Sequence, residues 1–328
     1  MLRLPPFTWL RPSSVDEALR MRADAGPQGQ FVAGGTDLYP NMKRRQETPT
    51  VVIDIASLPE LRSVGAAAGG GLRLGAGLRL SEVERQRDLL AGFPAVTHSA
   101  STISTPLLRN MGTLGGNLLL DTRCNYYDQT FEWRKSIDFC MKKDGAVCWV
   151  APGSPRCWAV QSSDLAPVMV AMGAEVTLRS AAGERSIPAE ALYVNDGMKF
   201  LSKRPEELLT AITLPAPAGT RAVYRKVRRR GSFDFPVLGT AVWARFEGKT
   251  VADIRLVLGA VASHPIRVKA AEDLLRGKPL GEETMRAAAE ICWKLARPMD
   301  NTDLTLGWRK DVVRPEVVRA LQGLAEEK

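Results

Sequence analysis

Four of the five cysteines in this 328-residue chain fall inside one short stretch, residues 121–161, and no other feature constrains the fold as strongly. The four are Cys124, Cys140, Cys148 and Cys157. The same stretch carries seven aromatic residues and shows neither helical nor strand periodicity. We therefore expect an ordered loop with little regular structure.

The spacing of these cysteines, C-x15-C-x7-C-x8-C, leaves three interpretations open. Structural zinc sites usually contain close C-x2–4-C pairs, and this stretch has none. A [4Fe–4S] cluster also takes four cysteine ligands, and its corners do not demand close pairs. Disulfides are the least favoured interpretation in a reducing cytosol. The aromatic residues would exclude water from a cluster, and six basic residues of the stretch would offset part of its negative charge.

Two glycine-containing turns form a second candidate site. Ala33-Gly34-Gly35-Thr36-Asp37 follows a predicted strand over 30–33 and precedes an amphipathic segment. Thr113-Leu114-Gly115-Gly116-Asn117 has the same character. Glycines let backbone N–H groups approach a phosphate closely. Two interpretations of the pair of turns are therefore about equally favoured: a nucleotide pyrophosphate site and two purely structural turns.

Better-known nucleotide and nucleic-acid motifs are absent. Gly75-Ala76-Gly77 has Leu80 where a Rossmann fingerprint needs its third glycine. Gly248-Lys249-Thr250 lacks the upstream glycine of a P-loop. The net charge of +9 is spread along the chain, and Arg228-Arg229-Arg230 comes without a recognition motif. We expect no NAD-type fold, no ATPase activity and no nucleic-acid partner.

Two kinds of residue that often carry chemistry are expected to be structural. Cys292 lies beside Ile291 on an apolar helix face, which indicates a core position. His98 and His264 have no partners in the pattern of a catalytic triad or a metal site.

Helical and strand patterns alternate irregularly along the chain, which predicts the α+β class. We expect a helix over 15–23 capped by Ser13 or Ser14, a hairpin turning at residues 69–71, and a helix over 81–90. The segment 215–219, rich in Pro and Gly, marks a domain boundary. No apolar run reaches the roughly 18 residues of a membrane span, so we expect a cytoplasmic protein with no membrane partner.

Four segments, in order, resemble the FAD-binding subunit of the molybdenum hydroxylases, the family of xanthine dehydrogenase and carbon monoxide dehydrogenase. They are AGGTDL (33–38), RNMGTLGGNL (109–118), SDLAPVMVAMGAEV (163–176) and Y-x-K-x-x-R-R (224–230). Ordinary members lack the four-cysteine insertion. The insertion is similar to that of the 4-hydroxybenzoyl-CoA reductase β subunit, which carries a [4Fe–4S] cluster, so the resemblance favours the cluster over zinc.

The resemblance also implies a domain arrangement. Residues 1–216 would form a FAD-binding domain of the vanillyl-alcohol-oxidase (PCMH) type, with subdomains over 1–57 and 58–216. The cluster loop at 121–161 would be inserted into it. Residues 217–328 would form a C-terminal α+β domain of the CO dehydrogenase flavoprotein type.

Site residues follow from the matching motifs. The cluster ligands would be the four clustered cysteines. The implied FAD-binding residues are Phe31, Val32, Ala33, Gly34, Gly35, Thr36, Asp37, Leu38, Ile103, Thr113, Gly115, Gly116, Asn117, Asp164, Leu209 and Lys226. Asp164 would accept hydrogen bonds from sugar or ribityl hydroxyls, and Lys226 would approach the isoalloxazine edge. No residue of this chain is expected to be catalytic, because the substrate would bind elsewhere.

The implied partners are a large molybdopterin subunit and a small subunit with two [2Fe–2S] clusters, in an (αβγ)2 assembly. Electrons would pass from ferredoxin through the [4Fe–4S] cluster and FAD to the [2Fe–2S] clusters and molybdenum, where 4-hydroxybenzoyl-CoA is reduced to benzoyl-CoA. The alternatives are an oxidative hydroxylase of another aromatic or heteroaromatic substrate, a zinc-stabilised nucleotide-binding scaffold, and a stand-alone flavin oxidase. We also expect the flavin turns to be separate from the cysteine loop.

Overall fold

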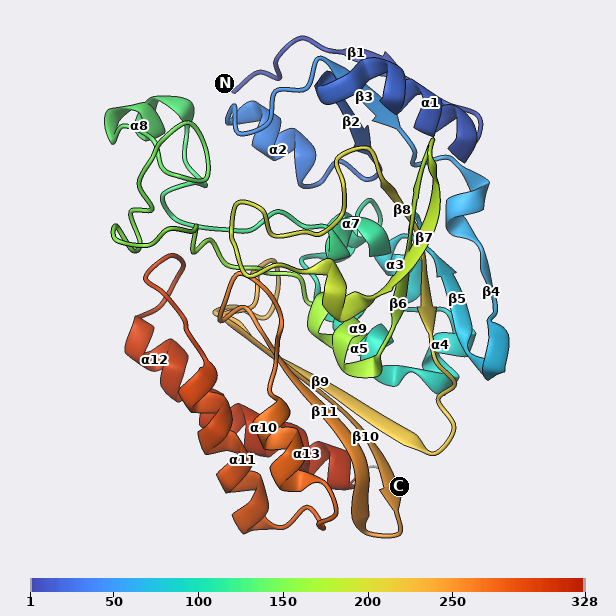
Figure 1. Cartoon of the computed structure of the whole chain (residues 1–328), viewed down its shortest axis with the longest axis vertical. Coiled ribbons are helices and arrows are strands. Elements are labelled where there is room, and N and C mark those ends of the chain that lie inside the picture. The colour runs from blue at the N-terminus through green and yellow to red at the C-terminus, as the bar shows by residue number, and fades with distance from the viewer. Residues whose placement is uncertain (1, 327–328) are drawn as a thin grey trace.

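The computed structural model describes residues 2–326 and contains three β-sheets with helices packed around them (Figure 1). The first sheet is parallel and has the order β1-β3-β2. Its strands are β1 (Thr8–Leu10), β2 (Gly29–Val32) and β3 (Val51–Asp54), and its helices are α1 (Val15–Ala25) and α2 (Leu38–Lys43). Helix α1 begins where the Ser14 side chain accepts a hydrogen bond from the Glu17 N–H, as the sequence predicts.

The second sheet is antiparallel and has the order β4-β5-β8-β6-β7. Its strands are β4 (Val64–Ala66), β5 (Leu72–Gly75), β6 (Glu175–Ser180), β7 (Gly183–Pro188) and β8 (Leu208–Leu214). The helices of this part are α3 (Leu80–Val83), α4 (Arg87–Gly92), α5 (Pro94–Thr102), α6 (Pro106–Arg109), α7 (Leu114–Leu118) and α9 (Leu165–Met172). Every residue of α9 is buried, so this helix lies at the centre of the fold.

The third sheet is antiparallel, has the order β12-β11-β10-β9, and is covered on both faces. Its strands are β9 (Thr220–Val227), β10 (Leu238–Glu247), β11 (Thr250–Gly259) and β12 (Ile266–Arg267). Its helices are α10 (Lys269–Leu275), α11 (Glu282–Leu295), α12 (Leu306–Asp311) and α13 (Val313–Glu326). Successive residues of β10 alternate between two cores: Ala241 and Trp243 pack with α9, while Val242 and Ala244 pack with α11 and α13.

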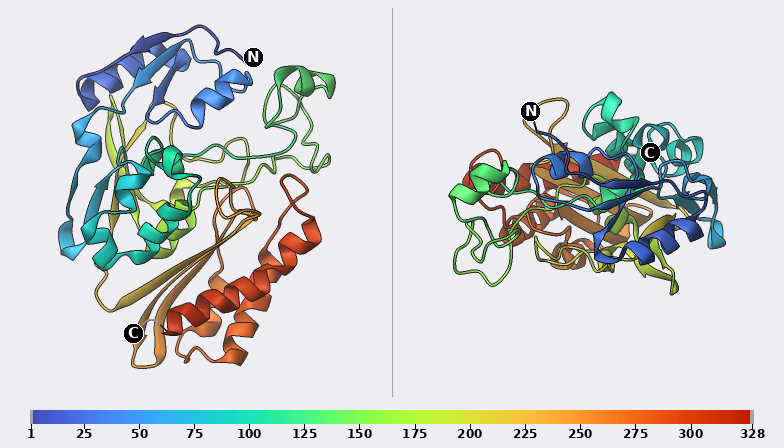
Figure 2. Two further views of the ribbon diagram at one scale, coloured as in Figure 1. Left: turned by 180° about the vertical axis from the view of Figure 1, so that it is seen from behind. Right: turned by 90° about the horizontal axis from the view of Figure 1, so that it is seen from above.

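The cysteine-rich stretch 121–161 leaves the sheets as an irregular arm, and α8 (Phe131–Ser136) is its one helix (Figure 1). The view from behind in Figure 2 shows the same arm beside α2 and near the loop before α12. Hydrogen bonds hold it at both places. The Arg134 guanidinium donates to the carbonyls of Arg44 and Arg45. The Asn301 side chain donates to the Trp158 carbonyl, and the Asn301 carbonyl accepts from the Asn125 N–H.

The α+β class is confirmed, and most predicted elements are found within a few residues of their predicted limits. The predicted helix over 81–90 is wrong in one respect, because it is split into α3 and α4. The Gln86 side chain accepts from the N–H groups of Asp88 and Leu89 and so starts a new helix. Short 3-10 turns cover Gly26–Gln28, Pro59–Arg62, Ala68–Gly70 and Ala189–Leu192.

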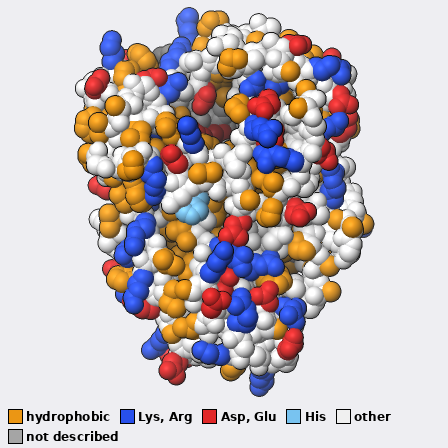
Figure 3. All heavy atoms as spheres, viewed as in Figure 1, with side chains coloured by type: hydrophobic (Ala, Val, Ile, Leu, Met, Phe, Trp, Pro, Cys, Tyr) orange, Lys and Arg blue, Asp and Glu red, His pale blue; other side chains and the backbone are white. Residues whose placement is uncertain are grey.

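The length and apolarity of the helices and the distribution of charge on the surface are the features relevant to a membrane or nucleic-acid partner. Within residues 2–326, no helix is both long and apolar enough to cross a membrane. Figure 3 shows Lys and Arg side chains interspersed with Asp and Glu on the face seen there. That face carries no continuous basic stripe of the kind that binds a phosphate backbone.

Candidate functional site

The first glycine turn, between β2 and α2, is packed directly against the second. A Cβ atom on Gly34 would lie 1.9 Å from the Met111 carbonyl oxygen, so only glycine fits there. Gly35 has φ +68°, a left-handed conformation that favours glycine. Within residues 2–326, the N–H groups of Gly34, Gly35 and Thr36 donate to no protein acceptor. They are therefore available to an anionic ligand.

The second turn differs from the first, because its N–H groups are already used. The N–H of Leu114 donates to Leu78, that of Gly115 to Ala76, and that of Gly116 to the Thr113 hydroxyl. The prediction that both turns offer free backbone donors is thus wrong for the second. Its backbone instead ties the second turn to the segment after β5, where Gly115 leaves no room for a Cβ beside Ala76.

Asn117, at the end of the second turn, connects it to α9. The side-chain oxygen of Asn117, Oδ1, accepts from the Ser163 hydroxyl at 2.7 Å and from the Leu165 N–H at 3.3 Å. Ser163 in turn accepts from the Ala166 N–H at 3.0 Å. This network fixes the start of α9, and with it the position of Asp164.

Asp164 and Lys226 form a buried ion pair, with Nζ 2.9 Å from Oδ2. The other carboxylate oxygen accepts from the Tyr224 hydroxyl at 2.7 Å, and Nζ also donates to the Thr102 carbonyl at 3.0 Å. Burial raises the pKa of Asp164 and lowers that of Lys226, and each shift is opposed by the charge of the partner. The pair joins β9 of the third sheet to α5 and α9.

The remaining predicted flavin-site residues are apolar or backbone positions. Ile103 follows Thr102 directly and is buried, and its carbonyl accepts from Arg109 at 3.0 Å. Leu209 lies in β8 and is buried in the same core. Phe31, Val32, Ala33 and Leu38 pack into two small cores on either side of the first turn. Their side chains therefore support the turn, and a ligand would meet their backbone.

The four clustered cysteines converge, although they are far apart in sequence. All four are free and buried, and together they line one pocket. The other lining residues are Tyr126, Tyr127, Met141, Lys142, Trp149 and Val150. The pocket has a volume of 10 Å³, about that of one water probe.

The four thiols line one pocket but do not surround a single metal ion. Within residues 2–326, no three or more His, Cys, Asp or Glu side chains form a group that could hold a metal ion. A tetrahedral zinc site would need four sulfurs about 2.3 Å from a single ion. The hydrogen bond from the Cys157 thiol lowers the pKa of Cys148 to about 5, whereas burial raises the pKa of Cys124 to about 12. The thiols therefore share a pocket without forming a metal-binding group in this structure.

The two sites touch each other, so the expectation that they are separate is wrong. The Arg123 guanidinium, next to Cys124, forms an ion pair with Asp37 of the first glycine turn. Arg123 also pairs with Asp128 at 3.3 Å, and Asp128 accepts from the Cys124 N–H at 3.2 Å. Sequence reasoning missed this link, because the partners are 86 positions apart. Sequence reasoning also missed the hydrogen bonds of Tyr224 with Asp164 and of Ser163 with Asn117, whose partners are 60 and 46 positions apart.

The remaining cysteine and the two histidines are the residues that the sequence predicts to be structural. Cys292 is fully buried in the core between α11 and the third sheet. Burial lowers the pKa of both His98 and His264, and neither belongs to a metal-binding group within residues 2–326.

Comparison with known proteins identifies the family. The family described as the FAD binding domain in molybdopterin dehydrogenase matches residues 5–217, and the CO dehydrogenase flavoprotein C-terminal domain matches residues 222–324. The aldehyde oxidoreductase FAD-binding subunit PaoB of Escherichia coli (strain K12) is 32% identical over 299 residues, which cover 86% of this chain and 90% of PaoB. The carbon monoxide dehydrogenase medium chain of Hydrogenophaga pseudoflava is 27% identical over 318 residues, which cover 97% of this chain and 96% of that one.

Solved structures agree with the sequence comparisons. A chain of the carbon monoxide dehydrogenase from Hydrogenophaga pseudoflava superposes with a TM-score of 0.81 and 27% identity, over 98% of both chains. A chain of the reconstituted CO dehydrogenase from Oligotropha carboxidovorans shares the fold with a TM-score of 0.83 at 22% identity, over 99% of this chain and 100% of that one. This chain therefore belongs to the molybdopterin dehydrogenase FAD-binding family and is the flavin subunit of a molybdenum hydroxylase-type enzyme.

Proposed function

We propose that this chain is an electron-transfer subunit that holds FAD at its glycine turns and a [4Fe–4S] cluster on its four clustered cysteines. The observation that carries the proposal is the contact between the two sites. Arg123, which precedes the proposed cluster ligand Cys124, forms an ion pair with Asp37 of the first glycine turn. Such adjacency suits the passage of electrons from one group to the other within a single chain.

The residues at the glycine turns fit a dinucleotide. The free N–H groups of Gly34, Gly35 and Thr36 would hold the pyrophosphate, and the second turn would keep the first in place. Asp164 and Lys226, with Ile103 and Leu209 nearby in the core, would form the flavin end. When bound, FAD supplies redox chemistry in both one-electron and two-electron steps. The chain supplies the orientation and the charge around it.

The residues that line the cysteine pocket fit a cluster in their donor atoms. Four free thiols in apolar surroundings are the ligand set of a [4Fe–4S] cluster, which binds one thiolate at each of four irons. The four cysteines would hold the cluster, and the aromatic and aliphatic side chains around them would keep water away from it.

We further propose that the complex acts oxidatively. The relatives named as aldehyde oxidoreductase, carbon monoxide dehydrogenase and xanthine dehydrogenase subunits support this direction. A large molybdenum subunit would bind the substrate, a small subunit would carry [2Fe–2S] clusters, and no side chain of this chain would touch the substrate. We also propose that residues 1–216 and 217–328 are its two domains, with the arm 121–161 inserted in the first.

The second candidate is the subunit of a 4-hydroxybenzoyl-CoA reductase, in which electrons enter from ferredoxin and flow toward molybdenum. The four-cysteine arm favours it, because the arm resembles the insertion of that enzyme. The fold serves both directions equally well.

Turnover of the intact complex, purified anaerobically with its partner subunits, tests the direction. The oxidative proposal predicts reduction of an artificial acceptor by aldehydes or heteroaromatic substrates. It also predicts that benzoyl-CoA does not form from 4-hydroxybenzoyl-CoA and reduced ferredoxin. Formation of benzoyl-CoA would overturn it in favour of the second candidate. Substrate-driven flavin reduction by the isolated chain would contradict both and indicate a stand-alone oxidase.

A further inference from the structure

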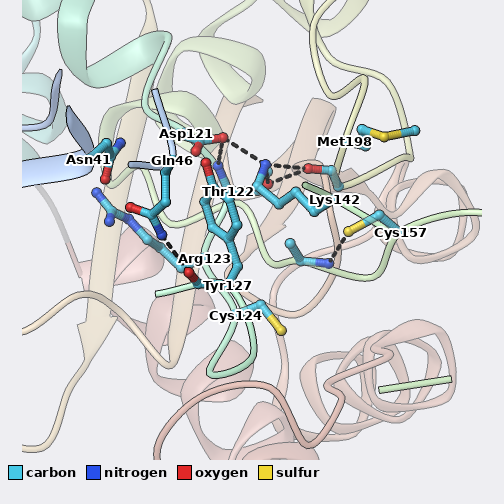
Figure 4. A network of polar contacts seen from close by, with 12 residues as sticks. Asn41, Gln46, Asp121, Thr122, Arg123, Cys124, Tyr127, Lys142, Cys157 and Met198 are labelled. Atoms are coloured by element: carbon cyan, nitrogen blue, oxygen red, sulfur yellow. Dashed lines mark hydrogen bonds and ion pairs between the residues drawn. The ribbon is translucent and has the colours of Figure 1, made fainter. Parts of the chain in front are cut away.

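One basic side chain, that of Lys142, lines the cysteine pocket together with all four thiols. The stretch 121–161 contains five other Lys and Arg residues, and none of them lines this pocket. The Lys142 side chain is 6% exposed, which is unusual for a lysine. Figure 4 shows its amine directed toward Asp121 and Thr122, at the start of the cysteine arm.

The Lys142 ammonium is fixed by three acceptors and two rings. It donates to Asp121 Oδ1, to the Thr122 hydroxyl and to the Gly197 carbonyl, each at 2.8 Å. The rings of Tyr127 and Phe200 lie 4.7 and 5.3 Å from Nζ. All three donor positions of the ammonium are therefore used, which fixes the charge at one place beside the pocket.

The neighbouring lysine shows the contrast. Lys143 has a side chain that is 35% exposed, pairs with Asp144 at 3.8 Å, and does not line the pocket. Its charge faces solvent, where water and salt screen it. The two lysines thus carry the same charge at adjacent positions, one enclosed beside the thiols and one at the surface.

We propose that the Lys142–Asp121 pair sets the reduction potential of the group held by the four cysteines. This inference rests on the proposed cluster. Reduction adds one electron, and so one negative charge, to that group. An enclosed positive charge favours the added electron, whereas an enclosed negative charge opposes it, and both effects are strong where water is excluded. Lys142 lines the pocket and Asp121 lies behind it, so the net effect of the pair is to raise the potential.

The sign of the effect separates tuning from a structural role. Lys142→Met leaves Asp121 without its partner and lowers the potential. Asp121→Asn keeps the ammonium and raises it. The double variant, which lacks both charges, lies between the two. A merely structural pair would lower the iron content in every variant without opposite shifts in potential.

The experiment is a redox titration of the anaerobically purified holocomplex with dithionite, followed by electron paramagnetic resonance, together with iron and flavin analysis. We expect opposite shifts for Lys142→Met and Asp121→Asn at unchanged iron content, and the wild-type potential for the control Lys143→Met. Equal potentials or shifts of the same sign would overturn the inference. If Lys142→Met loses its iron, the Asp121→Asn potential decides alone: a rise supports the inference and no rise refutes it. A wild-type complex with no iron beyond that of the small subunit's [2Fe–2S] clusters would refute the proposed cluster itself.

Discussion

The flavin turns and the cysteine arm lie next to each other but are built in opposite ways. The turns are short segments locked between regular elements, and their binding groups are backbone N–H groups of Gly34 and its neighbours. The arm has one short helix, and its candidate ligands are side chains. In the first region the fold itself makes the site. In the second, side-chain contacts to α2 and to Asn301 hold a loop around four thiols.

This difference explains how each site responds to change. A backbone site is lost when the packing of the turn is disturbed, even by one carbon atom. A side-chain site is lost when one ligand is removed, while the surrounding fold survives.

The largest effect is expected from Gly34→Val. A Cβ at this position would lie 1.9 Å from the Met111 carbonyl oxygen, which is backbone and cannot rotate away. The two turns must then separate, so we expect FAD binding to fall by more than about 100-fold, with overpacking that costs about 3 kcal/mol of stability. Flavin absorbance per chain measures the loss. Gly65→Ala in β4 is the matched control, because its Cβ meets nothing within 4 Å.

Cys140→Ser tests the arm in the same way. We expect the loss of the cluster with most FAD retained, because the packing around Gly34 and Gly115 does not involve this thiol. Iron and flavin per chain are the measurements. Cys292→Ala is the control and should keep its iron, since Cys292 lies in a separate core. Four irons retained in Cys140→Ser would contradict the ligand assignment.

Asp164→Asn is expected to have an intermediate effect. It removes the carboxylate that pairs with the buried Lys226 ammonium and leaves that charge without its counter-ion. Loss of one partner of a buried pair costs about 3–5 kcal/mol. We expect a lower midpoint of unfolding and FAD binding that is weaker by about 10-fold or more. Isothermal titration with FAD checks the second point, and an unchanged affinity would remove Asp164 from the flavin site.

The smallest effect is expected where the two regions meet. Arg123→Met breaks the contact with Asp37 while it keeps an unbranched apolar side chain at this position. Because the Asp37 side chain is 27% exposed and water can replace part of the lost contact, we expect a loss of about 1 kcal/mol, or roughly fivefold in FAD affinity. The iron content should stay the same. A variant that loses both cofactors completely would show that the regions load as one unit, which would break the comparison made here.

In both regions, the sequence predicts which residues form the site but not which distant segments contact them. The cysteines, the α9 segment and the first turn are visible because they need particular residue types. The link between Asp37 and Arg123, the role of Lys142 and the use of the second turn's N–H groups are set by which distant segments the fold brings together. The break between α3 and α4 at Gln86 and the strand β8 are not predicted, because local sequence patterns favour them only weakly.

The central claim is that one chain holds a flavin and a cluster in adjacent sites. Metal, sulfide and flavin analysis of the anaerobically purified complex, together with paramagnetic resonance of the dithionite-reduced sample, tests it most directly. The account predicts one FAD and one [4Fe–4S] cluster for each copy of this chain, in addition to the [2Fe–2S] signals of the small subunit. Zinc in place of that iron, or a Cys148–Cys157 disulfide in the freshly purified protein, would contradict it.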